Sequence, residues 1–294
     1  MLEHAIEKAS VLIEAMPYIQ AFRGETVVVK FGGSILDDDG SYAEILRDVA
    51  FMEIIGMRPV IVHGGGKAIT RRMSDAGIPA NFVRGLRVTD AATVAIVEKT
   101  LNDEVNPAVR RVLEDLNAPA VGIRGQDIFE VVQHEVADPE TGEMFNWGYV
   151  GDVQSVNVEG ILAALDAGKV PVVTPLGRDR EGRIYNINAD EAAGAMARQL
   201  QARKLVFLSD VPGLLRDPSD PKSIISTLTL AEMERLIADG TIAGGMLPKV
   251  AGAVKALRAG IRKTHIIDAQ MPHSLLLELF TAQGVGTEIV GDFS

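Results

Sequence analysis

Residues 27–34 read VVVKFGGS, a short run of β-branched side chains that leads to a lysine and two glycines. A continuous apolar run of this length is typical of a strand buried on both faces of a parallel sheet. Glycines after such a strand let the backbone turn sharply and approach a ligand, and phosphate is the usual occupant of such a loop. A tight turn beside a solvated lysine explains this stretch equally well when it is taken alone.

The same order of strand, glycines and helix repeats downstream. PVIVH (59–63) runs into three glycines at 64–66, and a predicted helix follows that ends near Gly77. Between the two strands, residues 41–56 have a capping-box pattern and a closing glycine, so they are predicted to be a helix. Both glycine turns are expected at the same sheet edge, where ligands of open α/β folds bind.

Apolar strands alternate with helical segments through most of the chain, which predicts an α/β fold with a mainly parallel sheet. Residues 127–135 and 149–157 are expected to be antiparallel strands. After residue 200 the pattern restarts with a new strand and a new glycine turn, which indicates a boundary between two lobes.

Composition excludes several classes of protein. The chain has 294 residues, no cysteine and a formal net charge of -11. Disulfides and thiol chemistry are therefore excluded, and a nucleic-acid surface is not expected. No window approaches the roughly 18 uninterrupted apolar residues of a membrane span. The N-terminus lacks the pattern of a signal peptide, so we expect a soluble, cytoplasmic protein that binds no membrane.

Polar residues gather at three further points. Asn186, Asn188 and Asp190 alternate where a strand ends and a helix begins, so they are expected to point the same way, although one could simply cap the helix. Lys249 falls in the first turn of a predicted helix, where a cation opposes the helix dipole unless an anion lies nearby. Arg87 suits a carboxylate, with a solvated surface arginine as the alternative.

The histidines give no metal site. None of the five forms a His-x-x-x-His pair, so zinc is not expected, and no protein metal ligand is predicted. His63 ends a buried strand, where a packed and hydrogen-bonded imidazole is at least as good an explanation as a functional one.

Six motifs, in this order, resemble those of the amino acid kinase family: VVVKFGGS, VIVHGGGKAI, GLRVTD, NINADEA, LVFLSDVPGLL and GGMLPKV. The resemblance covers nearly all of the chain after residue 24 and is greatest to the branch that phosphorylates N-acetyl-L-glutamate in arginine biosynthesis. It implies a three-layer αβα fold with an open, mainly parallel central sheet and two lobes. The implied divisions are an N-terminal oligomerisation helix (1–22), an N-acetylglutamate-binding lobe (23–200) and an ATP-binding lobe with an arginine site (201–294).

The resemblance also implies roles for single residues. Lys30 and Lys249 would neutralise the transferring phosphoryl group, and Asp190 would hold both lysines in place. The implied substrate contacts are Gly65, Gly66, Arg87 and Asn186, with Asn188 in a supporting role. The implied nucleotide contacts are Gly32, Gly33, Ser209 and Asp210. Mg²⁺ would arrive with ATP, held mainly by its phosphates.

One position departs from the family pattern. Asn146 and Trp147 stand where an acidic-aliphatic pair is expected before Gly-x-Val-Gly. This departure leaves the details of the substrate lid open.

The N-terminal helix has an apolar stripe formed by Leu2, Ile6, Ala9, Ile13 and Met16. Such a stripe must be buried, either on its own lobe or elsewhere. Arginine-inhibited members of the family resemble this chain in having such a helix, which joins dimers into a hexameric ring. The resemblance therefore implies a homohexamer made of three dimers and a possible signal-transduction protein partner. It also implies inhibition by L-arginine bound at His265, Glu278 and Gly284.

The implied reaction is phosphorylation of the γ-carboxylate of N-acetyl-L-glutamate by ATP. A carboxylate is already ionised at neutral pH, so the site must supply positioning and charge neutralisation instead of a base. One alternative is another kinase of this fold, acting on glutamate, aspartate, carbamate or UMP. The other is a non-catalytic arginine-sensing protein.

Overall fold

The computed structural model describes residues 2–32, 39–137, 144–217, 219–220, 223–242, 247–258, 260–281 and 284–291. Gly33 lies outside these residues. For Lys249 only its place within a helix is described.

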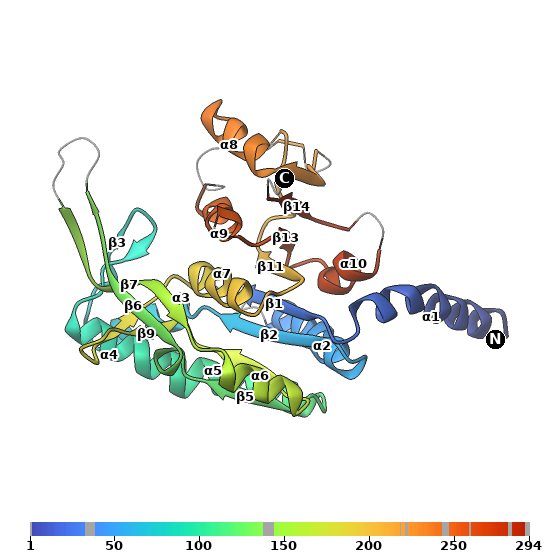
Figure 1. Ribbon diagram of the computed structural model, residues 1–294, viewed down its shortest axis with the longest axis horizontal. Coiled ribbons are helices and arrows are strands. Elements are labelled where there is room, and N and C mark those ends of the chain that lie inside the picture. Colours follow the sequence, from blue (N-terminus) through green and yellow to red (C-terminus); the bar gives the residue numbers. More distant parts are fainter. Residues whose placement is uncertain are drawn as a thin grey trace.

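Eight strands form the central sheet, in the order β12-β14-β13-β11-β1-β2-β8-β5 (Figure 1). Their bounds are β1 Thr26–Phe31, β2 Arg58–His63, β5 Ala120–Ile123, β8 Val170–Val173, β11 Lys204–Ser209, β12 Thr227–Thr229, β13 Lys263–Asp268 and β14 Thr287–Val290. All pairings from β13 to β5 are parallel, and only the β13–β14 pairing is antiparallel. The predicted mainly parallel sheet is therefore confirmed.

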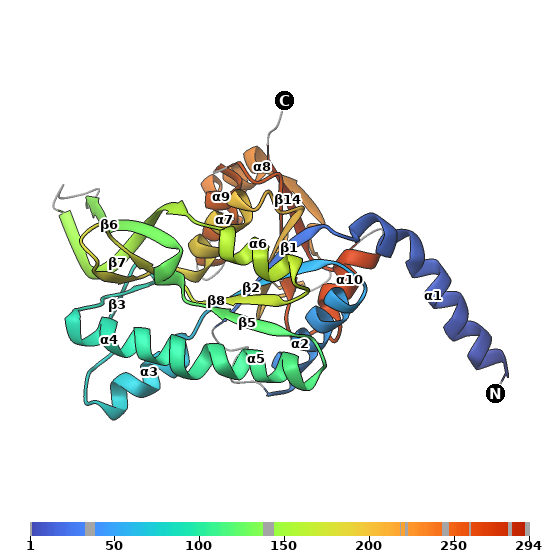
Figure 2. The same ribbon diagram turned by 60° about the horizontal axis from the view of Figure 1, so that its bottom comes forward.

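Successive side chains of β1 enter two different hydrophobic cores. Val28 belongs to the core on one face of the sheet, and Val27 and Val29 belong to the core on the other, all three without solvent exposure. The first face is covered by α6 Glu159–Asp166, α7 Ala189–Gln199, α8 Leu230–Ala238 and α9 Leu247–Arg258. The second is covered by α2 Asp39–Ile54, α5 Asn106–Asp115 and α10 Ser274–Phe280. The three-layer arrangement is confirmed, and it explains why the strand needs an unbroken apolar run (Figure 2).

A second, smaller sheet of four strands closes on itself beside the first. It is formed by β6 Phe129–Ala137, β7 Met144–Val156, β9 Leu176–Arg178 and β10 Ile184–Asn186. The antiparallel pairing of β6 with β7 confirms the pair of strands predicted from the sequence. The remaining elements are α3 Gly66–Asp75, β3 Phe82–Val83, β4 Leu86–Arg87, α4 Ala91–Thr100, the π-helix Leu101–Val105 and the 3-10 helix Gly125–Asp127.

The predicted helices match the structure apart from small differences at their ends. The helix expected over 41–56 is α2, which begins two residues earlier at Asp39. The helix expected to stop near Gly77 is α3, which ends at Asp75. Strands before residue 200 occupy one half of the central sheet and strands after it occupy the other. The division into lobes at residue 200 remains a prediction.

Helix α1, Leu2–Phe22, projects away from the rest of the molecule (Figures 1 and 2). Its predicted apolar stripe is exposed, with Ile13 at 64%. The alternative that this stripe packs on its own lobe is therefore wrong for this structure. The end of the helix is anchored, because Phe22 packs edge-on against Phe280 of α10 with 6.3 Å between ring centroids. No helix in the described part of the chain has an apolar stretch long enough to cross a bilayer.

Candidate active site

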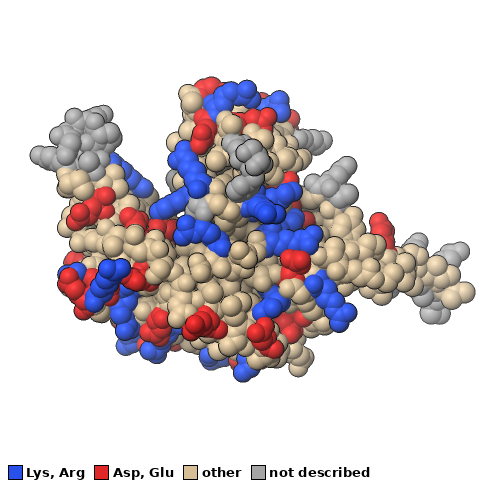
Figure 3. Space-filling view, in the orientation of Figure 1, with Lys and Arg blue, Asp and Glu red and all other residues tan. Residues whose placement is uncertain are grey.

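A pocket of about 230 Å³ lies at the carboxyl ends of β1 and β2. Its walls come from β1, the glycines after β2, the β3–β4 hairpin and the segment joining β10 to α7. Seven residues given roles in the sequence analysis line it together: Lys30, Gly65, Gly66, Arg87, Asn186, Asn188 and Asp190. The surface is hollowed between the β6–β7 hairpin and the part of the molecule that contains α8 and α9, and lysine and arginine side chains gather on the latter side (Figure 3).

Lys30 and Asp190 form an ion pair across this pocket. The Lys30 Nζ atom lies 2.6 Å from Asp190 Oδ1, and the two side chains are only 18% and 23% exposed. Asp190 is the second residue of α7, and Asn188 caps this helix by accepting the N–H of Asp190 at 2.8 Å. The capping interpretation is therefore correct for Asn188, and all three residues line the pocket.

The second turn of α9 lies close to the same side chain. A Cβ atom added to Gly252 would come within 2.6 Å of the Asp190 Cβ atom, so only glycine permits this approach. Lys249 precedes Gly252 by three residues in the same helix. Three elements, β1, α7 and α9, converge on Asp190.

The glycines at 32 and 65 are explained by packing within the loops. A Cβ atom on Gly32 would lie 3.0 Å from the Gly64 Cα atom, and one on Gly65 would lie 2.6 Å from Leu101 Cδ2. The Gly64 N–H also donates to the Phe31 carbonyl at 2.8 Å. Gly66 differs, because no atom lies within 4 Å of its added Cβ. Of these glycines, Gly66 leaves the most room for a ligand.

Arg87 is buried, so the alternative of a solvated surface arginine is wrong. Its Nη2 donates to the Gly66 carbonyl at 3.0 Å and to Thr70 Oγ1 at 2.9 Å. The guanidinium carbon stacks 4.5 Å from the centroid of the Phe82 ring. Burial lowers the pKa of this guanidinium, which nevertheless stays protonated at neutral pH. A fixed positive charge therefore lies in the pocket wall.

Trp147 anchors the β3–β4 hairpin that carries Arg87. The hairpin turns through Arg84 and Gly85, both with positive φ, as a two-residue turn requires. The Trp147 indole is buried, and its Nε1–H donates to the Val83 carbonyl at 3.1 Å. Its neighbour Asn146 accepts the N–H of Gly148 at 2.6 Å. The Asn146-Trp147 departure from the family pattern thus places a buried, hydrogen-bonded tryptophan beneath the hairpin. The spacing of residues in the sequence could not reveal this role.

Of the predicted nucleotide residues that the structure describes, Gly32, Ser209 and Asp210 are not part of the pocket lining. Ser209 ends β11, two residues beyond Phe207, which is in register with Lys30. Its hydroxyl lies 3.4 Å from Asp210 Oδ1. Their expected contact with a nucleotide remains a prediction.

The three residues predicted to bind arginine meet in the C-terminal half. His265 Nδ1 lies 2.7 Å from a Glu278 carboxylate oxygen, and both side chains are buried. The other oxygen accepts the Val285 N–H at 3.0 Å, and a Cβ atom on Gly284 would lie 2.6 Å from it. Burial lowers the pKa of His265. Burial alone would raise the pKa of Glu278, but the His265 hydrogen bond and charge, the Val285 N–H and the Lys204 charge lower it overall. The structure therefore supports a neutral imidazole that donates to a carboxylate.

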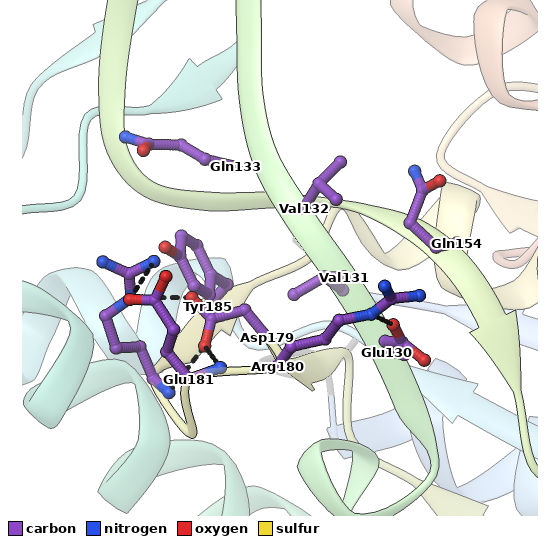
Figure 4. A pocket seen from close by; sticks show the side chains of 10 residues that line it. Glu130, Val131, Val132, Gln133, Gln154, Asp179, Arg180, Glu181 and Tyr185 are labelled. Carbon is purple, nitrogen blue, oxygen red and sulfur yellow. Dashed lines mark hydrogen bonds and ion pairs between the residues drawn. The ribbon is translucent and has the colours of Figure 1, made fainter.

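A second pocket, of about 410 Å³, lies against β6 and the β9–β10 segment (Figure 4). None of the residues predicted for the site lines it. Its charged side chains are paired with one another, Arg180 with Glu130 and Arg183 with Asp179. This pocket offers less uncompensated charge to a ligand than the first.

His63 is a packed, hydrogen-bonded histidine, the explanation that the sequence supported at least as well as a functional role. It has no solvent exposure, and burial lowers the pKa of its imidazole to about 4. The ring is therefore neutral at physiological pH and is not a proton donor to substrate.

The family model described as the amino acid kinase family matches residues 25–268. The chain is 46% identical over 286 residues to a protein named acetylglutamate kinase from Akkermansia muciniphila, covering 97% of this chain and 96% of that protein. It is 44% identical over 292 residues to one from Syntrophomonas wolfei, covering 99% and 100%.

Solved structures give the same fold. An N-acetylglutamate synthase from Neisseria gonorrhoeae, bound to coenzyme A and N-acetyl-glutamate, matches with a TM-score of 0.82 and 27% identity. That match covers 97% of this chain and 64% of the synthase chain, so the chain spans about two thirds of that protein. A carbamate kinase from Giardia matches with a TM-score of 0.65 and 19% identity, over 92% of this chain and 99% of that one, and shows the fold alone.

Burial of a neutral His63 predicts stability that is lost in acid. Above pH 6.5 both folded and unfolded chains hold a neutral imidazole. Between pH 6.5 and 4 the unfolded chain takes up the proton first, so the free energy of unfolding falls, by roughly 2–3 kcal/mol at pH 4.5. Denaturant titrations of wild type and His63→Gln, at one protein concentration from pH 7.5 to 4.5, give the free energy of unfolding at each pH. The effect of His63 is the difference between the two proteins in the slope of this free energy against pH. Equal pH slopes for the two proteins would contradict it.

Proposed function

The chain belongs to the amino acid kinase family, and from this we propose that it is an acetylglutamate kinase, transferring phosphate from ATP to the γ-carboxylate of N-acetyl-L-glutamate in arginine biosynthesis. The observation that carries the proposal is the pocket in which Lys30, Asp190 and Arg87 meet, in a chain similar along its length to acetylglutamate kinases. A reaction that consumes ATP is in keeping with the expected cytoplasmic location.

In the proposed reaction a γ-carboxylate oxygen attacks the γ-phosphorus of ATP. A bond forms between these two atoms, and the bond from the γ-phosphorus to the bridging oxygen breaks to release ADP. The carboxylate is already ionised, so the site brings two anions together and must offset their repulsion. Lys30 and Lys249 supply positive charge for this, and Asp190 orients them.

The substrate is held at the other side of the pocket. The guanidinium of Arg87 pairs with a carboxylate of N-acetyl-L-glutamate, since its position is fixed by Gly66 and Thr70. Backbone N–H groups of Gly65 and Gly66 and the side chain of Asn186 complete the binding site. Ser209 and Asp210, with Gly32 and Gly33, border the nucleotide.

Magnesium is proposed to enter with ATP. Within the described residues, no three His, Cys, Asp or Glu side chains are grouped to hold a metal ion. One carboxylate oxygen of Asp190, Oδ1, is already paired with Lys30. Phosphate oxygens are the natural ligands of Mg²⁺ in such a site, and the ion would neutralise charge on the β- and γ-phosphates.

Hydroxylamine trapping of the acyl phosphate tests the function. We expect trapped product from N-acetyl-L-glutamate with MgATP, and only background from glutamate, aspartate, carbamate or UMP. Lys30→Met should lower turnover at least roughly 100-fold, because an oxyanion-stabilising charge is lost. Lys99→Met, which removes an exposed lysine on α4, should retain wild-type turnover.

Two outcomes would contradict these assignments. Wild-type turnover in Lys30→Met would remove that lysine from the reaction. Absence of product with every acceptor, alongside measurable arginine binding, would favour the non-catalytic arginine sensor.

Helix α1 supports the proposed hexamer. Its exposed apolar stripe extends away from the molecule, where a second copy of the chain could bury it. Introducing charge with Ile13→Asp should therefore convert a hexamer into dimers, measured by light scattering after size-exclusion chromatography. The matched control is Glu14→Gln, which alters a neighbouring exposed residue. Equal masses for wild type and Ile13→Asp would contradict this role for α1.

Feedback inhibition by L-arginine is proposed at His265, Glu278 and Gly284. Because the Glu278 carboxylate is fully used by protein groups here, a bound guanidinium would replace one of those contacts. Glu278→Gln keeps the shape but removes the charge, so the arginine concentration for half-inhibition should rise at least roughly tenfold. The rate of each protein with arginine is divided by the rate of the same protein without arginine. Unaltered inhibition in Glu278→Gln would remove this residue from the site.

A further inference from the structure

A buried pair of polar side chains lies directly beneath the glycine loop. His63 ends β2 and Asn106 begins α5, and neither is appreciably exposed. His63 Nδ1 lies 2.9 Å from the Gly64 carbonyl oxygen, and His63 Nε2 lies 3.2 Å from Asn106 Nδ2. Asn106 Nδ2 also donates to the Val172 carbonyl of β8 at 2.8 Å. A continuous chain of hydrogen bonds thus joins β8, α5, β2 and the loop.

The partners fix the direction of each hydrogen bond. A carbonyl oxygen can only accept, so the Gly64 carbonyl requires a proton on His63 Nδ1. Both hydrogens of the Asn106 amide are used, one toward Val172 and the other toward His63 Nε2, which must therefore be an unprotonated acceptor. The neutral imidazole in its Nδ1–H form satisfies every group.

The local fold is built around Asn106. The π-helix Leu101–Val105 interrupts the regular turns between α4 and α5 and ends immediately before this residue. Leu101, at the start of the π-helix, packs against Gly65. On the opposite side, a Cβ atom on Gly122 of β5 would collide with Asn106 Oδ1. The widened turn of the π-helix and the missing side chain of Gly122 together make room for the Asn106 amide. A π-helix is rare and often marks a functional site, so packing alone is a poor explanation for this arrangement.

The hydrogen bond from His63 to the Gly64 carbonyl determines the direction of the Gly65 N–H. Gly64 and Gly65 share a planar trans peptide, in which the C=O and the N–H point in opposite directions. When His63 binds the Gly64 carbonyl, the Gly65 N–H is directed away from the core. Gly64 and Gly65 both line the candidate pocket.

We propose that Asn106, acting through His63, is a positioning residue that keeps the Gly64–Gly65 peptide turned so that its N–H is presented to the anionic acceptor substrate. The inference rests on the proposed function, because the acceptor is taken to be N-acetyl-L-glutamate. Asn106 itself does not touch substrate. Without its donor, His63 can adopt the Nε2–H form, release the Gly64 carbonyl and let the peptide rotate.

The first test is made on the wild-type protein without any substrate. Imidazole ¹⁵N NMR, with His63 assigned through loss of its signals in His63→Gln, should show His63 in the Nδ1–H form at pH 7.5. A His63 ring in the Nε2–H form, or protonated on both nitrogens, would overturn the proposal. This measurement does not depend on which acceptor the enzyme uses or on whether an Asn106 variant folds.

The second test separates positioning from general loss of structure. Asn106→Leu should raise the KM for N-acetyl-L-glutamate roughly tenfold or more, the effect of losing one hydrogen bond to a charged group, and leave the KM for ATP within about twofold. Val109→Ala, one turn further along α5, removes buried packing without touching His63 and should move neither KM. An unchanged KM for the acceptor in Asn106→Leu, with only a lower kcat, would overturn the positioning role.

Failure of the proposed function gives a different result. If the wild type phosphorylates another acceptor instead, the same KM comparison is made with that acceptor, and the NMR result stands by itself. A shift confined to the KM of that acceptor would support the positioning role while rejecting N-acetyl-L-glutamate.

Discussion

An ammonium and a carboxylate 2.6 Å apart tie the end of β1 to the first turn of α7, and the site is organised around this pair. The carboxylate of Asp190 also lies at the positive end of the α7 helix dipole, which favours a negative charge there. Gly252 brings α9 against the Asp190 side chain, so a third element reaches the same residue. Removing the carboxylate would leave the Lys30 ammonium without this partner.

Around this pair the pocket is shaped by backbone contact as much as by side chains. The loops after β1 and β2 touch through Gly32 and Gly64, and Leu101 fills the space over Gly65. Arg87 fixes α3 to the hairpin, and Trp147 fixes the hairpin to the small sheet. Each wall of the pocket is thus held by a contact from another element, which gives the short distances that phosphoryl transfer requires.

Local pattern was sufficient to predict the central sheet and the glycine turns at its edge, and it singled out the charged residues Lys30, Arg87 and Asp190 that line the pocket. VVVKFGGS is informative because a strand buried on both faces needs an unbroken apolar run, which no polar alternation interrupts. The same reasoning could not find Asn106 or the role of Trp147. Their partners, His63 and Val83, lie far along the chain, and neither a π-helix nor a hydrogen bond across sheets leaves a periodic signal. The close packing of Gly252 on Asp190 was hidden for the same reason.

The strand order of the central sheet has a consequence for how the chain reaches its folded state. Val27 of β1 is in register with Lys204 of β11, so the two strands at the middle of the sheet come from distant parts of the chain. Until β11 has been synthesised, β1 is an unpaired apolar edge, a surface prone to aggregation. Such non-local parallel pairing makes folding slow. A fragment that stops near residue 200 keeps that edge exposed, so the first half of the sheet depends on the second for solubility as well as for chemistry.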